Sequence, residues 1–573
     1  MSNTSNLVTL TIDGKQVTVP DTFTVLEAAQ TCGVHIPTLC WMKDLNEIGS
    51  CRMCVVDIEG KHTLSAACNT YACDGMVVHS TTPRVIEARR GNLNFILENH
   101  RTSCTTCQRS GTCALQEIAE DFAMDDLKYP EHYEEKDWDE TLPLQRDASK
   151  CIRCMRCVVE CAKVQHCEVW EMSGPEQYRT VRKTGNGCAQ CGQCVTHCPT
   201  GALTARNDIN RVMRALADPD TLTVVQTAPA VRAAWGEGVG LSHKNASLGK
   251  LADALKRLGF DYVYDTIFGA DLTIMEEGSE VIEWLKSGKK RPMFTSCCPG
   301  WVRFAKLHYP DFVEQLSSSK SPHQMQGAFI KHTHDKALAE SGKKRIFVVS
   351  IMPCMAKKYE CDVPQLSTDR GRDVDAVLTT RELDTMIRLF GIDASTLQDV
   401  EFDSPLGTPT GAGTIFGRTG GVMEAALRTA CYLLTGENPD FSTCDTTQAT
   451  PERPWSDKQI EVAGLTLSIA VTSGLENTAK LLDALRAGEV SYDFVEVMAC
   501  PGGCVGGGGQ PITFNQEMWE ERASVLNSLD KGYPLRRSHE NPDVERAYQE
   551  WVGEPLSETA EAWLHTDQEA WDI

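Results

Sequence analysis

The sequence predicts a multidomain protein of the α+β and α/β classes, with small cysteine-rich domains before a large C-terminal α/β domain. At 573 residues the chain is long enough for several hydrophobic cores. Many of its 26 cysteines stand in short, regular spacings before residue 200. From about residue 210, short apolar segments alternate with helical patterns, which is typical of a parallel sheet covered by helices.

The first domain is predicted from a hairpin and a cysteine spacing. Residues 7–19 alternate apolar and polar side chains around Asp13-Gly14, and Thr24 to Gln30 has the pattern of a short helix. Four cysteines with gaps of ten, two and thirteen residues follow: Cys40, Cys51, Cys54 and Cys68. Because plant-type ferredoxins hold a 2Fe–2S cluster with a similar loop, we expect residues 1–80 to form a plant-type 2Fe–2S ferredoxin-like domain.

The next segment, residues 81–125, combines a helix with a mixed ligand set. The pattern of Pro83 to Asn99 indicates a helix, and one imidazole and three thiolates come after it: His100, Cys104, Cys107 and Cys113. By ligand type alone this set also suits zinc, but a third electron carrier, a 4Fe–4S cluster, fits the neighbouring motifs better. The acidic stretch at 117–140 has the composition of a solvated linker.

Residues 126–209 contain one cysteine pattern twice. The two copies are Cys151, Cys154, Cys157 and Cys161, then Cys188, Cys191, Cys194 and Cys198 followed by Pro199. In bacterial-type ferredoxins the last cysteine of each run binds the other cluster, so the pattern predicts two neighbouring 4Fe–4S clusters that transfer electrons. A zinc site or a disulfide explains two interleaved quartets poorly. Between Arg146 and Lys183, eight basic residues stand against five acidic ones, which favours docking of an acidic redox partner.

The composition excludes other classes of protein. A net charge of -23 argues against nucleic-acid binding, and no apolar run reaches the roughly 18 residues needed to cross a membrane. The N-terminal residues have neither a basic signal region nor twin arginines, so we expect a cytoplasmic protein. Cluster-binding thiolates must stay reduced, which indicates an anaerobic or strongly reducing compartment.

The C-terminal region, residues 210–573, is predicted to be α/β. Its pattern gives strands or helices at 222–226, 247–258, 260–264, 279–286, 346–350 and 465–471. The tail from Asn541 to Ile573 carries three tryptophans among acidic residues and is expected to pack as an outer helix without a chemical role.

Three cysteine loops in this region point to another cluster. They are Thr295–Trp301 (TSCCPGW), Met352–Lys358 (MPCMAKK) and Met498–Gly509 (MACPGGCVGGGG). Loops at the carboxyl ends of parallel strands converge, so four thiolates can hold one cluster: Cys298, Cys354, Cys500 and Cys504. Cys297 then remains as a free thiol beside the metal centre, and the glycines let backbone N–H groups approach the sulfides.

These three motifs, together with the order of the N-terminal cysteine sets, closely resemble FeFe-hydrogenases of the monomeric, ferredoxin-linked type with four accessory clusters. The resemblance covers nearly the whole chain. It implies reversible reduction of two protons to dihydrogen. The implied cofactors are one 2Fe–2S cluster, three accessory 4Fe–4S clusters and an H-cluster, whose 4Fe–4S cubane is bridged by Cys504 to a diiron unit carrying CO, cyanide and azadithiolate. It further implies ferredoxin or flavodoxin as electron partner, dedicated maturation proteins and a monomeric state.

The resemblance also implies roles for single residues. Cys297 would pass protons to the bridging amine, Lys357 would hydrogen-bond a cyanide, and Met352 and Met498 would flank the iron pair. Glu277, Ser317 and Glu280 would form a proton relay. The remaining residues expected to line the cofactor pocket are Ala228, Pro229, Ala230, Pro322 and His323.

From the residues alone, some of these roles have plainer alternatives. Glu277 and Glu280 also suit an exposed acidic turn at a helix start. A buried ammonium requires an anion, so Lys357 needs a partner such as cyanide unless it is solvated, as we expect for Lys358.

The chain departs from the family pattern at three positions. Ala230 and His323 stand where many relatives have Ser and Gln, so proton handling or catalytic bias could differ. Trp284 stands where relatives often have an Arg near the outer end of the proton route, and no role is carried over to it. Six cysteines fit no cluster and are expected to be buried apolar thiols: Cys32, Cys73, Cys167, Cys361, Cys431 and Cys444.

Three alternatives to a monomeric enzyme remain. A non-catalytic iron–sulfur assembly protein of the same fold generally lacks the Cys297 thiol and the MPCMAKK loop. A sensory hydrogenase tends to carry a signalling domain and a different residue at the Cys297 position. A subunit of an NAD(P)-linked complex would need another chain, because no GxGxxG fingerprint follows a strand here.

Overall fold

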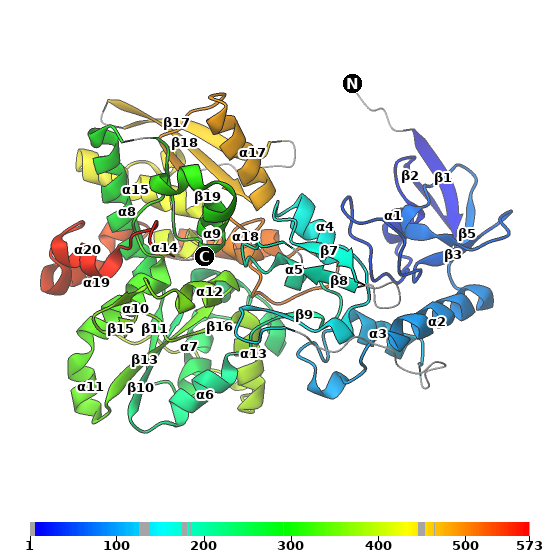
Figure 1. Cartoon of the computed structure of the whole chain (residues 1–573), viewed down its shortest axis with the longest axis horizontal. Helices are drawn as coiled ribbons and strands as arrows, with labels where there is room; N and C mark the ends of the chain where they lie inside the picture. Colours follow the sequence, from blue (N-terminus) through cyan, green and yellow to red (C-terminus); the bar gives the residue numbers. More distant parts are fainter. Residues whose placement is uncertain are drawn as a thin grey trace.

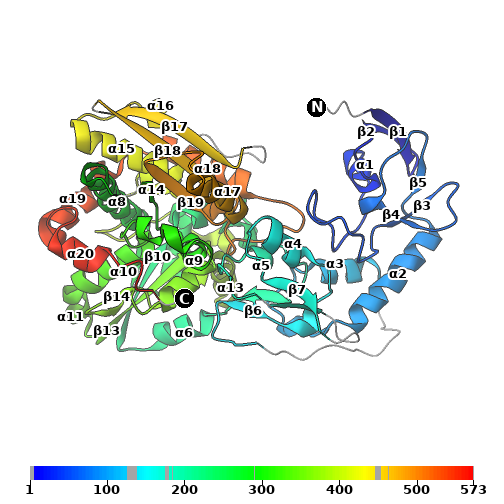
Figure 2. The ribbon, with the colours of Figure 1, turned by 45° about the horizontal axis from the view of Figure 1, so that its top comes forward.

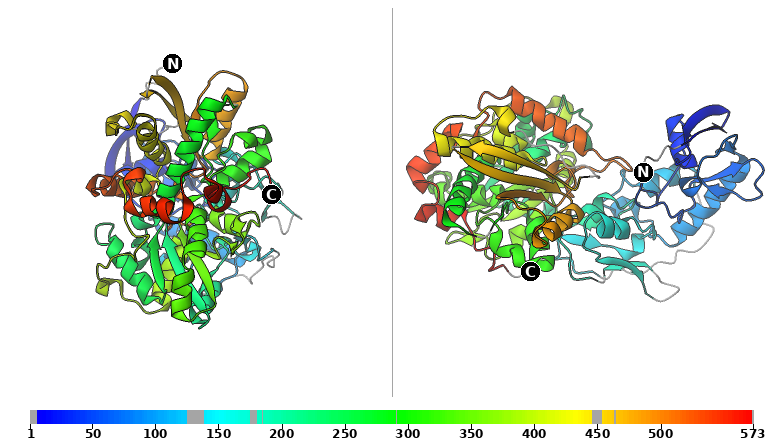
Figure 3. Two further views of the ribbon diagram at one scale, coloured as in Figure 1. Left: turned by 90° about the vertical axis from the view of Figure 1, so that its left-hand side faces the viewer. Right: turned by 90° about the horizontal axis from the view of Figure 1, so that it is seen from above.

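The computed structural model describes residues 6–124, 138–174, 180–183, 185–289, 291–444, 453–462 and 464–571. The small N-terminal sheet lies at one end of an elongated molecule and the large α/β domain at the other, with the segment around α4, α5 and β9 between them (Figures 1 and 2). The view from above in Figure 3 shows the same separation. Among the described residues, no helix is both long and apolar enough to cross a membrane.

The N-terminal domain is a five-stranded sheet in the order β2-β1-β5-β3-β4. Its strands are β1 (Leu7–Ile12), β2 (Lys15–Pro20), β3 (Val55–Ile58), β4 (Ser65–Ala66) and β5 (Val77–His79). The predicted hairpin is confirmed, since β1 and β2 pair antiparallel. The predicted helix is also confirmed as α1 (Val25–Thr31), which begins at a capping box formed by Thr24 and Glu27.

The middle of the chain is made of short elements between cysteine loops. The predicted helix before His100 is present as α2 (Pro83–Glu98), and α3 (Ala114–Asp121) follows the third cysteine of that set. The two-copy cysteine region contains α4 (Arg156–Lys163), α5 (Gln193–Thr196) and two small antiparallel ribbons. The ribbons pair β6 (Leu144–Arg146) with β9 (Leu203–Ala205) and β7 (Trp170–Ser173) with β8 (Thr180–Lys183).

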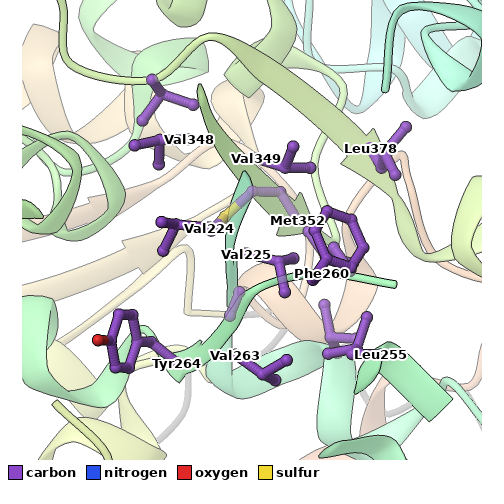
Figure 4. Packing of buried hydrophobic residues seen from close by; sticks show 14 of the residues in the cluster. Val224, Val225, Leu255, Phe260, Val263, Tyr264, Val348, Val349, Met352 and Leu378 are labelled. Carbon is purple, nitrogen blue, oxygen red and sulfur yellow. The ribbon is translucent and has the colours of Figure 1, made fainter. Parts of the chain in front are cut away.

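The C-terminal domain contains two four-stranded sheets, where the sequence pattern indicated one parallel sheet. The first sheet is wholly parallel, in the order β11-β10-β13-β16, and comprises β10 (Thr221–Thr227), β11 (Tyr262–Asp265), β13 (Arg345–Met352) and β16 (Ala376–Thr379). Figure 4 shows its apolar packing, with Val224 and Val225 of β10 close to Val348 and Val349 of β13.

The second sheet is mixed, in the order β12-β19-β18-β17. It comprises β12 (Met293–Phe294), β17 (Trp455–Val462), β18 (Leu465–Ser473) and β19 (Phe494–Met498). The strand predicted at 465–471 therefore exists as β18, but it pairs antiparallel with β17 and parallel with β19. Figure 1 shows the two sheets on opposite sides of the domain, with α9 and α14 between them.

Helices surround and separate these sheets. Those before residue 340 are α6 (Ile209–Ala217), α7 (Leu248–Arg257), α8 (Ile267–Ser287), α9 (Pro299–His308), α10 (Pro322–Thr333) and α11 (Asp335–Ser341). The next are α12 (Ala356–Asp362), α13 (Thr380–Leu389), α14 (Gly411–Ile415), α15 (Gly421–Thr435), α16 (Phe441–Cys444) and α17 (Leu475–Arg486). The last are α18 (Trp519–Gly532), α19 (Pro542–Ala547) and α20 (Glu558–Leu564), and a two-stranded ribbon pairs β14 (Ser367–Thr368) with β15 (Gly371–Arg372).

Two expectations for this domain are wrong in detail. The segment predicted at 279–286 is only the last third of α8, a 21-residue helix that packs against α10, α14 and α15. Glu277 and Glu280 therefore lie deep within a helix and not at its start. The tail does pack as outer helices α19 and α20, as predicted, but it also places His565 beside Glu276 of α8 and the Ser318 hydroxyl.

Candidate functional site

Three cysteine loops meet at the carboxyl ends of strands from both sheets. Cys297 and Cys298 follow β12, Cys354 follows β13, and Cys500 follows β19. The loops close around a cavity whose lining also includes most of the predicted pocket residues: Ala228, Pro229, Ala230, Cys297, Cys298, Pro322, His323, Met352, Cys354, Lys357, Met498 and Cys504. The prediction that these loops meet at the carboxyl ends of strands is therefore confirmed. The strands come from two sheets, whereas one sheet was expected.

The four thiols predicted to hold a cubane lie within electrostatic reach of one another. Burial raises the pKa of the Cys504 thiol, and the nearby Cys298 and Cys354 raise it further. Cys500 lies near Cys354 and Cys298 but does not line the cavity. Among the described residues, no three His, Cys, Asp or Glu side chains are placed to hold a single metal ion. Sets of four thiols that surround a larger volume suit a cluster better than a mononuclear zinc site.

Cys297 is a buried thiol at the edge of the cavity. Burial raises its pKa, and the neighbouring Glu277 carboxylate adds to the effect. The thiol is therefore protonated at neutral pH and can donate a proton into the cavity. The backbone carbonyl of Cys297 accepts a hydrogen bond from Lys357 Nζ at 3.0 Å.

Lys357 is held by a carboxylate that the sequence analysis did not identify. Its Nζ lies 2.9 Å from Oε2 of Glu360, one turn further along α12, and both residues are buried. The requirement for an anion is thus met within the chain. Lys358 is also fully buried, paired with Asp208 at 2.7 Å and with Glu382, so the expectation that it is solvated is wrong.

His323 is neither exposed nor bound to a backbone carbonyl. Its Nε2 contacts Oε2 of Glu360, and its Nδ1 lies 3.1 Å from the Ser350 hydroxyl. Burial lowers the pKa of His323, and the charge of Lys357 lowers it further. The ring is therefore neutral at pH 7, with the Nε2 proton directed to Glu360.

The predicted relay residue Glu277 lies near Cys297, and the other two, Ser317 and Glu280, lie near Glu277. Glu277 is fully buried, and burial followed by the charge of Glu280 raises its pKa to about 8. Ser296 and Ser317 lie near enough to oppose this shift, but neither makes a hydrogen bond of good geometry to the Glu277 carboxylate. Ser317 donates to Oε2 of Glu280 at 2.6 Å. A buried, neutral Glu277 is suited to proton transfer, and an exposed acidic turn is ruled out.

The duplicated cysteine motif forms two interleaved groups, as its spacing predicts. Cys151, Cys154 and Cys157 line one cavity together with Cys198 from the second run. Cys188, Cys191 and Cys194 line another with Cys161 from the first run. Cys167, expected to be an ordinary buried thiol, lines the second cavity too and contacts Cys161.

The two remaining ligand sets are also assembled. In the N-terminal domain, Cys51 N–H lies 3.5 Å from Cys40 Sγ, and the thiol of Cys54 contacts that of Cys68. His100 is buried, and its Nδ1 lies 3.1 Å from the Lys150 carbonyl, which makes Nε2 the nitrogen with a lone pair.

The other members of the His100 set lie close to the duplicated motif. Cys107 lies against Gly201, where a Cβ would approach its sulfur to 2.6 Å, and Cys113 Sγ is 3.6 Å from the Pro199 carbonyl. The Cys107 N–H donates to the Cys104 carbonyl at 3.0 Å, which joins these two residues of the set. Part of the acidic stretch that follows, residues 125–137, lies outside the described residues.

Short contacts join these sets in series. Asn46, fully buried, donates from one amide nitrogen to the Cys40 carbonyl at 2.7 Å and to the Cys154 carbonyl at 2.9 Å. At the other end, Cys500 Sγ lies 4.0 Å from the Cys191 carbonyl. A Cβ on Gly508 would approach that carbonyl oxygen to 2.6 Å, so glycine is needed there for the two loops to touch.

The remaining expectations have mixed outcomes. Three of the basic residues expected to form a docking patch instead donate hydrogen bonds to neighbouring parts of the chain: Arg146 to Val181, Arg153 to Asn99 and Arg156 to Trp41.

Among the cysteines outside the clusters, Cys361, Cys431 and Cys444 are buried as expected, while Cys32 is half-buried and Cys73 is exposed. Glu360 and Asn46 had no sequence signal, since their partners are distant in sequence or carry no motif.

Comparisons with known proteins match nearly the whole chain. The family model described as "Iron only hydrogenase large subunit, C-terminal domain" matches residues 221–508, and "Iron hydrogenase small subunit" matches 516–569. A "2Fe-2S iron-sulfur cluster binding domain" matches 5–83, and the "NADH-ubiquinone oxidoreductase-G iron-sulfur binding region" matches 89–128.

Individual relatives agree with these matches. The NADP-reducing hydrogenase subunit HndD of Solidesulfovibrio fructosivorans is 44% identical over 98% of both chains. Iron hydrogenase 1 of Clostridium pasteurianum is 36% identical over 97% of this chain and 99% of its own. A solved structure of a variant of the FeFe-hydrogenase HydA1 from Chlamydomonas reinhardtii is 39% identical with a TM-score of 0.57, covering 63% of this chain and 98% of its own.

Proposed function

The chain belongs to the iron-only hydrogenases, a family of oxidoreductases of hydrogen metabolism with iron–sulfur domains and an H-cluster, and we propose that it catalyses the reversible reduction of protons to dihydrogen. One observation carries this proposal. A cavity lined by Cys298, Cys354 and Cys504 has the protonated thiol of Cys297 on one wall, and Cys500, near Cys298 and Cys354, has its Sγ 4.0 Å from the carbonyl of Cys191 in an accessory set. Protons and electrons can therefore reach one site by separate routes.

In this proposal Cys298, Cys354, Cys500 and Cys504 would hold the H-cluster through their thiolates. When bound, the H-cluster supplies the iron pair at which electrons and protons combine. Lys357 presents a fixed ammonium group for a cyanide ligand, because Glu360 and the Cys297 carbonyl hold its side chain in place.

The rest of the cavity excludes water. Two methionines and several small apolar residues line it: Met352, Met498, Ala228, Pro229, Ala230 and Pro322. With water kept out, the charges and protons at the site are controlled by the fixed groups of the protein.

Protons would move between Cys297, Glu277, Ser317 and Glu280. The Cys297 thiol donates and regains a proton, and the neutral Glu277 is the nearest acid that can replace it. The Ser317 hydroxyl, bonded to Glu280 and near Glu277, would pass protons between the two carboxyl groups. The raised pKa of Glu277, about 8, is close enough to neutrality for it to exchange protons in both directions.

Electrons would follow two branches that merge. We propose one 2Fe–2S cluster in residues 1–80, a His/Cys3 4Fe–4S cluster in 81–125, two 4Fe–4S clusters in 126–209, and the catalytic domain in 210–573. Asn46 connects the first domain to Cys154. The Lys150 carbonyl, bonded to both His100 and Thr200, and the contact of Cys113 with Pro199 connect the second domain to the same cluster.

For the electron partner we propose ferredoxin or flavodoxin, acting on a monomeric cytoplasmic enzyme that maturation proteins have loaded. The HndD relative favours a second candidate, in which the chain is the hydrogen-converting subunit of an NADP-linked complex. The two candidates have the same catalytic site and differ only in the redox partner that exchanges electrons with the N-terminal clusters.

Infrared spectroscopy and turnover of the anaerobically matured chain test the function. We expect absorption bands of iron-bound CO and cyanide, together with dihydrogen evolution from a reduced viologen. A fully matured protein without these bands and without turnover would overturn the proposal. To identify the partner, the isolated chain is assayed with reduced ferredoxin and with NADPH. Turnover with ferredoxin alone supports the first candidate, whereas an NADP-linked complex purified around this chain supports the second.

A further inference from the structure

The proton relay does not end at Glu280 in this structure. Oε1 of Glu280 accepts from the Ser318 backbone N–H and lies 3.0 Å from the Ser318 hydroxyl. The same hydroxyl lies 2.8 Å from Nδ1 of His565. A single serine thus bridges the outer carboxylate of the relay to a histidine from the C-terminal tail.

Beyond His565 the hydrogen bonds continue into a second buried carboxylate. His565 Nε2 lies 3.0 Å from Oε2 of Glu276, which is fully buried on α8. Glu276 also accepts from the Tyr548 hydroxyl at 2.5 Å and from the Leu556 backbone N–H at 2.9 Å. Leu556 has a φ of 60°, a conformation that side chains other than glycine rarely adopt, so local backbone strain is tolerated where its amide meets Glu276.

The tail is held in register with the relay serines. Thr566 N–H donates to the Ser318 carbonyl, and Lys320 N–H donates to the Leu564 carbonyl, both at 2.8 Å. Gln568 Nε2 donates to the Ser317 carbonyl at 3.0 Å. Residues 564–568 therefore run antiparallel to 317–320 and pair His565 with Ser319, which holds the imidazole against the hydroxyl of the adjacent Ser318.

The indole of Trp284, which follows Glu280 on α8, cannot take a proton from Glu280. Trp284 is buried one turn beyond Glu280, and an indole N–H is a donor without an acceptor lone pair. An imidazole both accepts and donates, which a proton carrier must do.

We propose that His565 is the station that exchanges protons with Glu280, through the Ser318 hydroxyl, at the outer end of the relay. The proposal rests on the function proposed above. In the outward direction protonated Glu280 gives its proton to Ser318 Oγ while Ser318 gives its own to His565 Nδ1, which leaves a carboxylate and an imidazolium. The Nε2–H of that imidazolium stays bonded to Glu276, and the return transfer reverses each step.

The charges around His565 suit this role. Glu276 and Glu280 face it from α8, Glu561 lies within electrostatic reach on α20, and Lys320 nearby is neutralised by Asp373. Burial lowers the pKa of His565, but the bond to Glu276 and the charges of the acidic residues raise it above its ordinary value. Glu561 is exposed and offers the next step to solvent.

The test is His565→Gln in the matured holoenzyme, with His332→Gln as the matched control. His332 stacks on Trp563 of α20 but bonds Ala328 and Asp369, away from Glu280. We expect the His565→Gln variant to keep its iron content and its CO and cyanide bands, and to lose about 100-fold in turnover, since positioned proton carriers contribute on that order. Added imidazole should restore part of the rate, and the control should match wild type.

If His565→Gln folds poorly, a second variant and a measurement that does not depend on turnover still test the role of His565. Ser318→Ala leaves the His565–Glu276 bond in place and should also slow turnover. In protein matured without the diiron unit, nitrogen NMR of labelled histidines should show an imidazole that titrates above pH 6.5, absent in His565→Gln and shifted down in Glu276→Gln. Wild type that is active together with fully active His565→Gln and Ser318→Ala variants would overturn the inference. Wild type that lacks both turnover and infrared bands would instead overturn the proposed function.

Discussion

The ammonium group of Lys357 lies 2.9 Å from Oε2 of Glu360, and the same oxygen meets the imidazole of His323. One buried carboxylate therefore fixes two residues that line the catalytic cavity from different helices, α12 and α10. Burial would raise the pKa of Glu360, but Lys357 and His323 together lower it to about 2. Glu360 is therefore charged at neutral pH.

Replacement of Glu360 by Gln should destabilise the protein by about 3–5 kcal/mol, because it leaves the buried ammonium of Lys357 without its anion. The folded-state pKa of Glu360 lies below the ordinary value, so the ion pair contributes fully above about pH 4.5 and is lost only as the pH falls toward 2. The difference in denaturant midpoint between wild type and variant should then be constant from pH 6 to 8. Glu340→Gln breaks an exposed pair with Lys336 and should cost less than about 1 kcal/mol. Equal effects of the two variants would contradict this account.

Cys297→Ala should retain all clusters and lose nearly all turnover, since the thiol carries protons and binds no iron in the proposed mechanism. Cys298→Ala should lose the H-cluster itself, because three thiolates anchor the cubane poorly. Iron analysis and the CO and cyanide bands separate the two results. Cys361→Ala, which removes a buried thiol bonded to the Val374 carbonyl, is the control and should be active. Substantial turnover by Cys297→Ala would remove that thiol from the mechanism.

Glu277 should impose a pH limit on dihydrogen evolution. Its pKa is raised to about 8, chiefly by burial, so it is protonated and able to donate below that pH and becomes a carboxylate above it. We expect the wild-type rate of evolution to fall as the pH rises through about 8. Glu277→Gln should lower the rate about 100-fold and remove this transition. Glu283→Gln, on an exposed position of the same helix, should reproduce the wild-type profile. An unchanged transition in Glu277→Gln would assign it to another group.

Asn46 should matter for electrons that enter through the N-terminal domain. Asn46→Leu removes both hydrogen bonds between the Cys40 and Cys154 loops while leaving every cysteine in place. We expect a slower rate with ferredoxin and an unchanged rate with a small viologen that reaches later clusters directly. Removal of residues 1–80 should have the same pattern in a stronger form. If both variants keep the full ferredoxin rate, electrons enter through the His100 branch.

The sequence predicted the cysteine sets well because ligand spacing is a local property. Two residues between thiolates suit one loop around one cluster, whatever surrounds it. The strand-end rule likewise predicted that loops holding Cys298, Cys354 and Cys500 meet, since it depends only on strand direction. The mixed second sheet was missed, although β18 alternates apolar with mostly polar residues over Leu465–Thr472, a pattern typical of an antiparallel strand such as its pairing with β17.

The charged residues were harder to predict. Lys358 is buried with its anionic partners Asp208 and Glu382, and Glu277 is buried on α8, whereas no periodic pattern in a sequence indicates a buried charged residue. Glu360 was missed because its significance comes from His323, 37 positions away in sequence. His565 was missed for the same reason, since its partners on α8 lie almost 290 residues earlier.

His323→Gln should change the ratio of dihydrogen evolution to oxidation by an amount that does not depend on pH between about 6.5 and 8. From the sequence alone, a histidine at this position could switch its charge across pH 5 to 8. The structure argues against that switch, because burial and Lys357 lower the pKa of His323 and leave the ring neutral throughout this range. A neutral imidazole still differs from an amide, since it gives its Nε2 proton to Glu360 and takes one from Ser350, and so holds no donor toward the cavity. A Gln side chain at position 323 can keep the hydrogen bond to Glu360 with one group of its amide and direct the other group of the amide into the cavity. Steady-state assays in both directions at several pH values, with Ala230→Ser as a second variant of the same cavity, measure the effect. A bias difference that grows as the pH falls from 8 to 6.5 would show that His323 titrates there after all, and that Glu360 stabilises its charged form more than burial opposes it.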